Sequence, residues 1–83
     1  MQVTLKLYAS LGPYLPDGST RNQANVDVAD GTTIRELLDS YNLPPQACHL
    51  VLLNGVFQAP AMRAGAKLKT GDSVAVWPPV AGG

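Results

Sequence analysis

The sequence predicts an α+β fold in which a mixed sheet of four to five strands packs on one main helix. Short segments in both halves of the chain alternate apolar and polar residues, which is the pattern of half-buried strands. A segment near the middle changes to the helical period and begins with a capping signal. With 83 residues, the chain has room for one hydrophobic core and not for two.

The N-terminal third predicts two strands joined by a long loop. Residues 2–8 and 25–29 alternate in polarity, whereas residues 9–24 are rich in the turn-forming types Gly, Pro, Asp, Ser and Asn. We therefore expect two strands with one face each on the core. The side chains expected to face inward are those of Val3, Leu5, Leu7, Val26 and Val28.

The middle of the chain predicts the single main helix, over residues 33–42. Thr33 and Glu36 have the spacing of a capping box, in which each side chain binds a free backbone N–H of the first turn. The Pro-Pro pair at 44–45 prevents the helix from continuing. The helical spacing is carried by Ile34, Leu37, Leu38 and Tyr41.

The C-terminal half predicts a hairpin and a last strand. Residues 48–53 form a continuous apolar run, which favours a strand covered on both faces, and the Asn-Gly pair at 54–55 favours a tight turn. Residues 56–58 would return as a short strand, and residues 73–77 would form the last one. The expected inward side chains are Leu50, Leu52, Val74 and Val76.

The order strand, strand, helix, strand, short strand, strand is that of a β-grasp fold. We expect residues 1–79 to form this domain and residues 80–83 to follow it as a flexible tail that ends in Gly-Gly.

Composition excludes several classes of partner and site. Six basic and six acidic residues cancel, so a nucleic acid is not the expected main partner. No apolar run approaches the length needed to span a bilayer, so no membrane is expected either. A single cysteine and an N-terminus unlike a signal peptide indicate a cytoplasmic protein without disulfides.

The predicted domain offers few groups for catalysis. Cys48 and His49 are neighbours, so they would point to opposite faces of a strand, and we expect a buried thiol beside a surface imidazole. No Cys, His and carboxylate residues have metal-ligand spacing, and phosphate-loop glycine patterns are absent. We therefore expect a protein that is not an enzyme by itself and holds no cofactor or metal of its own.

Charged residues gather in two groups, and the role of each group can be interpreted in two ways. The acidic group lies in the middle of the chain, and the basic group consists of Arg63, Lys67 and Lys69. Each group is either an ordinary solvated surface or a polar rim that steers docking to a partner of opposite charge.

The last seven residues are unusual for the end of a domain. Pro78 and Pro79 hold an extended path after Trp77, and the terminal pair Gly82 and Gly83 carries no side chain that would block entry into a narrow channel. The sequence therefore predicts that the carboxylate of Gly83 is presented to other proteins.

The chain resembles the MoaD/ThiS family of ubiquitin-like sulfur carriers over nearly its whole length. The resemblance is carried by Leu7-Tyr8-Ala9, by the Asp-Gly-Thr-Thr-Ile-Arg-Glu-Leu-Leu segment 30–38, by Leu-Asn-Gly at 53–55 and by residues 68–83. The ending Pro-Pro-Val-Ala-Gly-Gly is the most specific part. It is typical of the MoaD branch, the small subunit of molybdopterin synthase.

This resemblance implies a carrier whose working group is the C-terminus. An E1-like adenylating enzyme would activate Gly83 with ATP, and a sulfur donor protein would convert the adenylate to a thiocarboxylate. A MoaE-like large subunit would then direct that sulfur at a pterin precursor of the molybdenum or tungsten cofactor. ATP would belong to the activating enzyme.

Recognition is expected on the sheet face away from the helix. Val51 and Leu53 would point there if Leu50 and Leu52 point inward. Phe57, Ala75 and Trp77 would extend the patch. Alternatively, the long 9–24 loop covers some of them. The expected partner interface consists of Val51, Leu53, Phe57, Trp77, Pro78, Pro79, Val80 and Ala81.

Three other functions remain open from the sequence. The chain could carry sulfur for thiamine or cysteine biosynthesis. It could be a ubiquitin-like modifier that joins Gly83 to lysines, or an interaction module with an inert tail.

Overall fold

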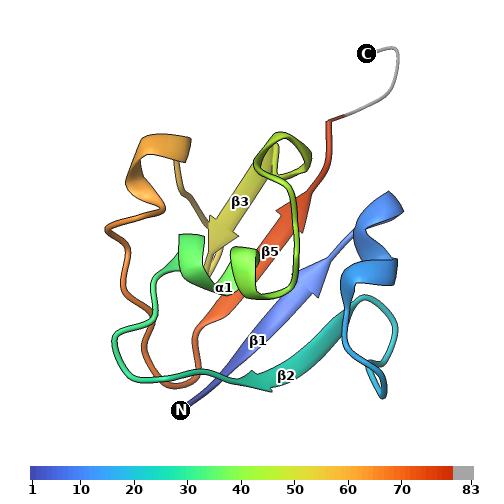
Figure 1. Cartoon of the computed structure of the whole chain (residues 1–83), viewed down its shortest axis with the longest axis horizontal. Coiled ribbons are helices and arrows are strands. Elements are labelled where there is room, and N and C mark those ends of the chain that lie inside the picture. Colours follow the sequence, from blue (N-terminus) through green and yellow to red (C-terminus); the bar gives the residue numbers. More distant parts are fainter. Residues whose placement is uncertain (80–83) are drawn as a thin grey trace.

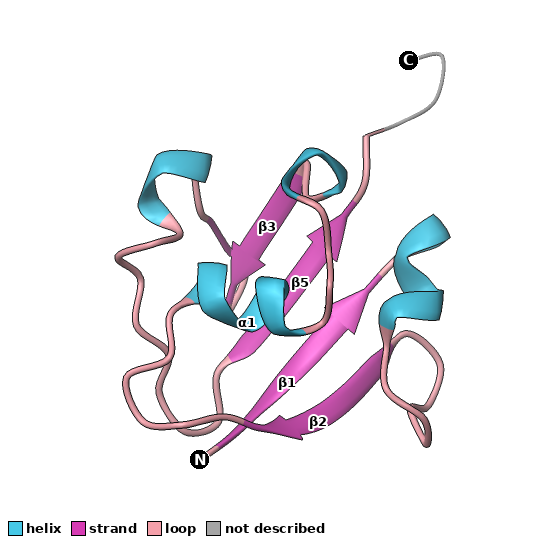
Figure 2. Ribbon diagram, in the orientation of Figure 1, coloured by secondary structure: helices cyan, strands magenta, loops and turns pink. Residues whose placement is uncertain are grey.

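The computed structural model describes residues 1–79; residues 80–83, the predicted tail, lie outside the described part. Within it, a five-stranded mixed sheet packs on one α-helix, as Figures 1 and 2 show, which confirms the predicted β-grasp architecture. The elements are β1 (Gln2–Leu7), β2 (Gln23–Asp27), α1 (Ile34–Ser40), β3 (Leu50–Leu53), β4 (Val56–Phe57) and β5 (Ser73–Trp77), with short 3₁₀ turns η1 (Ala9–Tyr14), η2 (Pro45–Ala47) and η3 (Pro60–Met62).

The strands lie in the order β2-β1-β5-β3-β4. The central pair, β1 and β5, is parallel, and the other three pairs are antiparallel. The first and last strands of the domain therefore lie side by side in the middle of the sheet (Figure 1).

The capping box predicted for α1 is present. The Glu36 amide donates to Thr33 Oγ1 at 3.1 Å, and the Thr33 amide donates to Glu36 Oε1 at 2.9 Å. The helix ends at Ser40, two residues before the predicted limit. There Asn42 takes a φ of 64°, and the Leu43 amide donates to the Leu38 carbonyl, which is the Schellman way of ending a helix.

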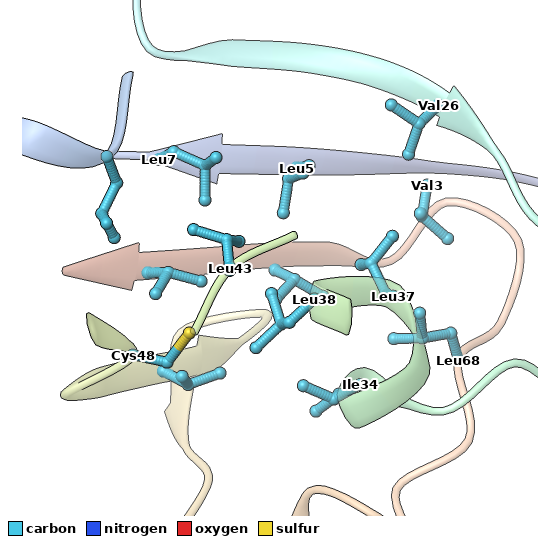
Figure 3. Close-up of a cluster of buried hydrophobic side chains, with 14 residues drawn as sticks. Val3, Leu5, Leu7, Val26, Ile34, Leu37, Leu38, Leu43, Cys48 and Leu68 are labelled. Atoms are coloured by element: carbon cyan, nitrogen blue, oxygen red, sulfur yellow. The ribbon is translucent and has the colours of Figure 1, made fainter. Parts of the chain in front are cut away.

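The core lies between α1 and one face of the sheet (Figure 3). Ten of the twelve predicted core positions lie in or against it, Val28 only partly buried, but Leu50 and Leu52 do not belong to it. The structure adds four buried residues that lie outside the strands and α1, and one, Val51, that lies in β3. These additions are Leu11, Leu43, Cys48, Val51 and Leu68.

The 9–24 segment is more ordered than a plain loop. Its first part forms η1, and the side chain of Leu11 is only 2% exposed because it packs into the core. Strand β2 begins at Gln23, two residues before the predicted start, where Thr20 and Gln23 form an isolated bridge. One buried leucine thus fastens a segment that its composition alone assigns to a loop.

Candidate functional site

The candidate site is the face of the sheet opposite α1, which is turned away from the viewer in Figure 2. Strand pairing defines this face because residues opposite each other in a ladder point to the same side. Leu52 pairs with both Ala75 and Phe57, and Leu50 pairs with Trp77. With Tyr8, which stacks on Trp77, these residues form what we call the outer apolar face: Tyr8, Leu50, Leu52, Phe57, Ala75 and Trp77.

Two predicted interface residues do not lie on this face. Val51 is 0% exposed and belongs to the core, and Leu53 is partly buried against the same core. The prediction was wrong because an unbroken apolar run does not show which alternate residues point inward. Pairing decides it: Val51 lies opposite Val76, a core residue.

The prediction that β3 is covered on both faces is also wrong. Its inward residue Val51 is buried, but Leu50 and Leu52 on the outer face stay partly exposed. These two leucines therefore replace Val51 and Leu53 in the candidate interface.

Trp77 is held firmly at the end of β5. Its ring stacks on that of Tyr8, with centroids 4.3 Å apart and planes 3° from parallel. The Trp77 carbonyl accepts a hydrogen bond from the His49 amide at 3.0 Å, and the Tyr8 amide donates to the Val76 carbonyl at 3.1 Å. The residue just before the proline arm is thus fixed from β1 and from the start of β3.

A shallow groove lies beside this point, which we call the tail-root groove. Its volume is about 470 Å³ and most of its surface is apolar. Trp77 forms part of it, and the chain leaves the sheet along it through Pro78 and Pro79. The lining residues are Ala9, Ser10, His49, Leu50, Trp77, Pro78 and Pro79.

The remaining predicted interface residues fall into two sets. Phe57 is 55% exposed on the short edge strand β4, so the 9–24 segment does not cover it. Pro78 and Pro79 line the groove. Val80, Ala81, Gly82 and Gly83 lie outside the described residues.

Cys48 and His49 lie apart as predicted. Cys48 is 3% exposed, and its Sγ donates to the Pro44 carbonyl at 3.6 Å, whereas His49 is exposed. Burial raises the pKa of the Cys48 thiol, so the sulfur stays protonated near neutral pH. The pair does not form a nucleophile and its base.

The predicted basic group loses one member. Arg63 is only 2% exposed, so it is not a surface cation, while Lys67 and Lys69 are exposed. Burial lowers the pKa of the Arg63 guanidinium, but the group starts so high that it keeps its charge. Nothing in the local sequence distinguishes Arg63 from a surface arginine.

The predicted interface also left out Tyr8, Leu50 and Leu52, all of which lie on the outer apolar face. The alternation over residues 2–8 does place Tyr8 opposite the core, so that signal was sufficient to find it. Leu50 and Leu52 could be found only from the register between β3 and β5.

Residues 1–79 contain neither a candidate metal-binding cluster nor a helix that could cross a membrane. No group of three or more His, Cys, Asp or Glu residues in this range could hold a metal ion. No helix in the same range is long and apolar enough to cross a bilayer.

A sequence model of the ThiS family matches residues 17–83, which include α1, the outer apolar face from β3 onward and the Gly-Gly ending. The chain belongs to the ThiS family. A search of curated protein sequences found no significant match.

Solved structures of similar proteins agree with this ThiS assignment. SAMP1 from Haloferax volcanii is 28% identical with a TM-score of 0.69 over 100% of both chains. The Haloferax volcanii HVO 2177 protein is 26% identical with a TM-score of 0.77, covering 100% of this chain and 87% of that one. A chain of the Helicobacter pylori complex of subunits 1 and 2 of molybdopterin-converting factor is 18% identical, with a TM-score of 0.59 over 100% of both chains.

The ThiS match and the similarity to SAMP1 place the protein among the ubiquitin-like sulfur carriers and modifiers. The likeness to the Helicobacter pylori chain, at 18% identity, concerns the fold.

Proposed function

We propose that this ThiS-family protein carries sulfur as a thiocarboxylate at Gly83 and delivers it in the biosynthesis of a molybdenum or tungsten pterin cofactor. The observation that carries the proposal is the tail-root groove. The outer apolar face, the groove and the Pro-Pro arm follow one another directly, and the next residues in the sequence are Val-Ala-Gly-Gly.

The chemistry follows from the weakness of a carboxylate as an electrophile. In the proposed first step, an E1-like enzyme joins the Gly83 carboxylate to the α-phosphate of ATP and releases pyrophosphate. Sulfur at the oxidation level of sulfide, supplied by a donor protein, then attacks the acyl carbon, and AMP leaves. This chain would contribute the carboxylate and the docking surface, and ATP would belong to the enzyme.

The outer apolar face would serve as the docking surface for the partners. Phe57 supplies an exposed aromatic ring at one edge, and the stacked Tyr8 and Trp77 rings lie beside the root of the tail. Aromatic side chains of this kind commonly dominate binding energy in protein interfaces. A partner that covers this face would therefore lie next to the residues that lead to Gly83.

The pterin pathway is supported by two features. The ending Pro-Pro-Val-Ala-Gly-Gly is typical of the MoaD branch. The fold is shared with the putative molybdopterin converting factor subunit 1 of Pyrococcus furiosus and with the Helicobacter pylori complex. We therefore propose a MoaE-like large subunit as the final partner, in the cytoplasm, where ATP is available and Cys48 stays reduced.

A second function has specific support. SAMP1 is described as a small archaeal modifier protein, and its similarity to this chain extends over the whole length at 28% identity. The same activated Gly83 could then be joined to lysine side chains of other proteins. Both functions share the adenylation step and differ in what attacks the acyl carbon.

Intact mass spectrometry of the protein from its native host tests these functions. The leading proposal predicts the mass gain of one oxygen replaced by sulfur, located at Gly83 by fragmentation. The modifier function predicts high-mass conjugates that contain Gly83 in an isopeptide bond. An unmodified mass, when the activating enzyme and ATP are both present, would contradict both.

A further inference from the structure

Arg63 is a buried cation whose described partners are all carbonyl oxygens. Its Nε donates to the Gln58 carbonyl at 3.0 Å, its Nη1 to the Cys48 carbonyl at 2.8 Å and its Nη2 to the His49 carbonyl at 3.4 Å. No ion pair of residues 1–79 includes it, since the one found there joins Arg35 and Asp39. The guanidinium is therefore buried without a carboxylate.

Such an arrangement is costly, because a buried charge loses its hydration and here regains only neutral hydrogen-bond acceptors. An apolar side chain of similar length would avoid the desolvation of a charge, but it would leave three carbonyl oxygens without these donors. A planar guanidinium differs from it in one useful respect: it can bind several acceptors at fixed angles. An arginine at this position is therefore best explained by the three carbonyl groups that it binds together.

The three bonds join the start of β3 to the segment that follows β4. One backbone bond already links Gln58 to β3, since its amide donates to the Val51 carbonyl at 2.8 Å. Gln58 follows β4, which has only two residues and two register pairs with β3. Cys48 and His49 precede β3. The guanidinium therefore continues the connection between these two segments beyond the end of the β3–β4 ladder. The Arg63 backbone is fixed as well, since its carbonyl accepts from the Arg35 amide of α1 at 3.1 Å.

Both joined segments carry parts of the candidate docking surface. Phe57, on the outer apolar face, is bonded directly to Gln58, and His49 lines the tail-root groove. The His49 amide also donates to the Trp77 carbonyl. The buried Arg63 side chain is thus connected, through Gln58, to the exposed Phe57 and, through His49, to the tail-root groove.

We propose that Arg63 is a positioning residue for partner docking: it holds Phe57 and His49 in the arrangement that the activating enzyme recognises. This inference rests on the proposed function. It implies that loss of the three guanidinium hydrogen bonds weakens binding of the carrier to the activating enzyme. The chemistry at Gly83 should continue normally once the complex has formed.

The test is the steady-state adenylation of the full chain by the activating enzyme of the same organism, measured by ATP–pyrophosphate exchange. Arg63→Met removes the hydrogen-bond donors of the guanidinium and keeps an unbranched side chain. Arg63→Lys keeps the charge without the planar guanidinium. We expect both to raise the KM for the carrier roughly tenfold and to leave kcat within about twofold of wild type. A wild-type KM in either variant would overturn the inference.

A matched control separates positioning from general loss of stability. Leu43→Ala opens a cavity in the core on the α1 side, away from the outer face, and should destabilise the domain without changing KM. All variants are assayed below their melting temperatures. If Leu43→Ala raises KM as much as Arg63→Met at equal loss of stability, the effect is unspecific and the inference fails.

A partner-free measurement distinguishes this inference from the proposed function. The amides of Gln58 and His49 donate to the Val51 and Trp77 carbonyls, and their hydrogen exchange should accelerate in Arg63→Met relative to the amides of β1 and β5. Unchanged exchange at these two positions would overturn the role of Arg63 alone. Absence of adenylation of the wild-type chain would overturn the proposed function instead.

Discussion

Single residues on the outer apolar face differ in how they are held. Trp77 is fixed by the Tyr8 ring and by backbone bonds, whereas Phe57 is 55% exposed on a two-residue edge strand. The types of both residues could be read from the sequence as candidates for binding. The inward position of Val51 could not be predicted from the sequence. In a run of apolar residues, the pattern does not show which alternate side chains face the core, and only the pairing of β3 with β5 does.

Phe57→Ala should weaken docking without loss of stability. The exposed ring contributes little to folding, so we expect the free energy of unfolding to stay within about 0.5 kcal/mol of wild type. Binding to the activating enzyme, measured by calorimetry, should weaken by about 1–3 kcal/mol. Val56→Ala is the matched control: this neighbour is 62% exposed but pairs with Leu53 on the opposite face. Equal losses of binding in the two variants would argue against the outer face.

The Cys48 thiol should respond to pH in a defined direction. Burial raises its pKa in the folded state above that in the unfolded state, so its contribution to stability is complete below the unfolded pKa. That contribution is lost as the pH rises through the folded pKa. The free energy of unfolding of wild type, from urea titrations, should therefore fall between neutral and alkaline pH by more than that of Cys48→Ala. Parallel pH profiles of the two proteins would contradict the assignment.

At the scale of elements, local signals and tertiary contacts contribute differently. The start of α1 could be predicted because the Thr33–Glu36 capping box is local. Its end could not be placed as well, because Asn42 adopts a left-handed conformation that the following proline pair does not specify. Segment η1 was missed because Leu11 is buried by contacts with the core, which the local sequence of residues 9–24 does not specify.

Removal of the α1 cap should have a small, measurable cost. Thr33→Ala deletes the acceptor for the Glu36 amide, and we expect a loss of about 1 kcal/mol in the free energy of unfolding. Thr33→Ser keeps the hydroxyl and should retain most of that energy. Chemical denaturation of both variants checks this, and equal stability of Thr33→Ala and wild type would show that the cap is unimportant.

At the scale of the whole molecule, the β-grasp order of elements could be predicted because each strand and the helix has its own pattern. The strand order, and with it the composition of the outer face, depends on long-range pairing that no local segment encodes. Arg63 is the clearest example, since its three acceptors lie up to 15 residues away in sequence.

Deletion of Gly82 and Gly83 should separate function from folding. Within residues 1–79, the core consists of residues between Met1 and Val76, so the melting temperature should match that of wild type. The proposed thiocarboxylate and the activity that depends on it should both be absent from the truncated chain, as measured by intact mass and by complementation of a deletion strain. A truncated chain that restores the molybdoenzyme activity of such a strain would refute the proposed function.

The parallel pairing of β1 with β5 has a consequence for biosynthesis. β5 lies between β1 and β3, so a nascent chain that stops before Ser73 lacks the strand that joins the two halves of the sheet. Such a chain cannot close its core, and it would be recognised as unfolded by proteases. The two halves of the sheet can therefore join only in a chain that has been synthesised through the last strand.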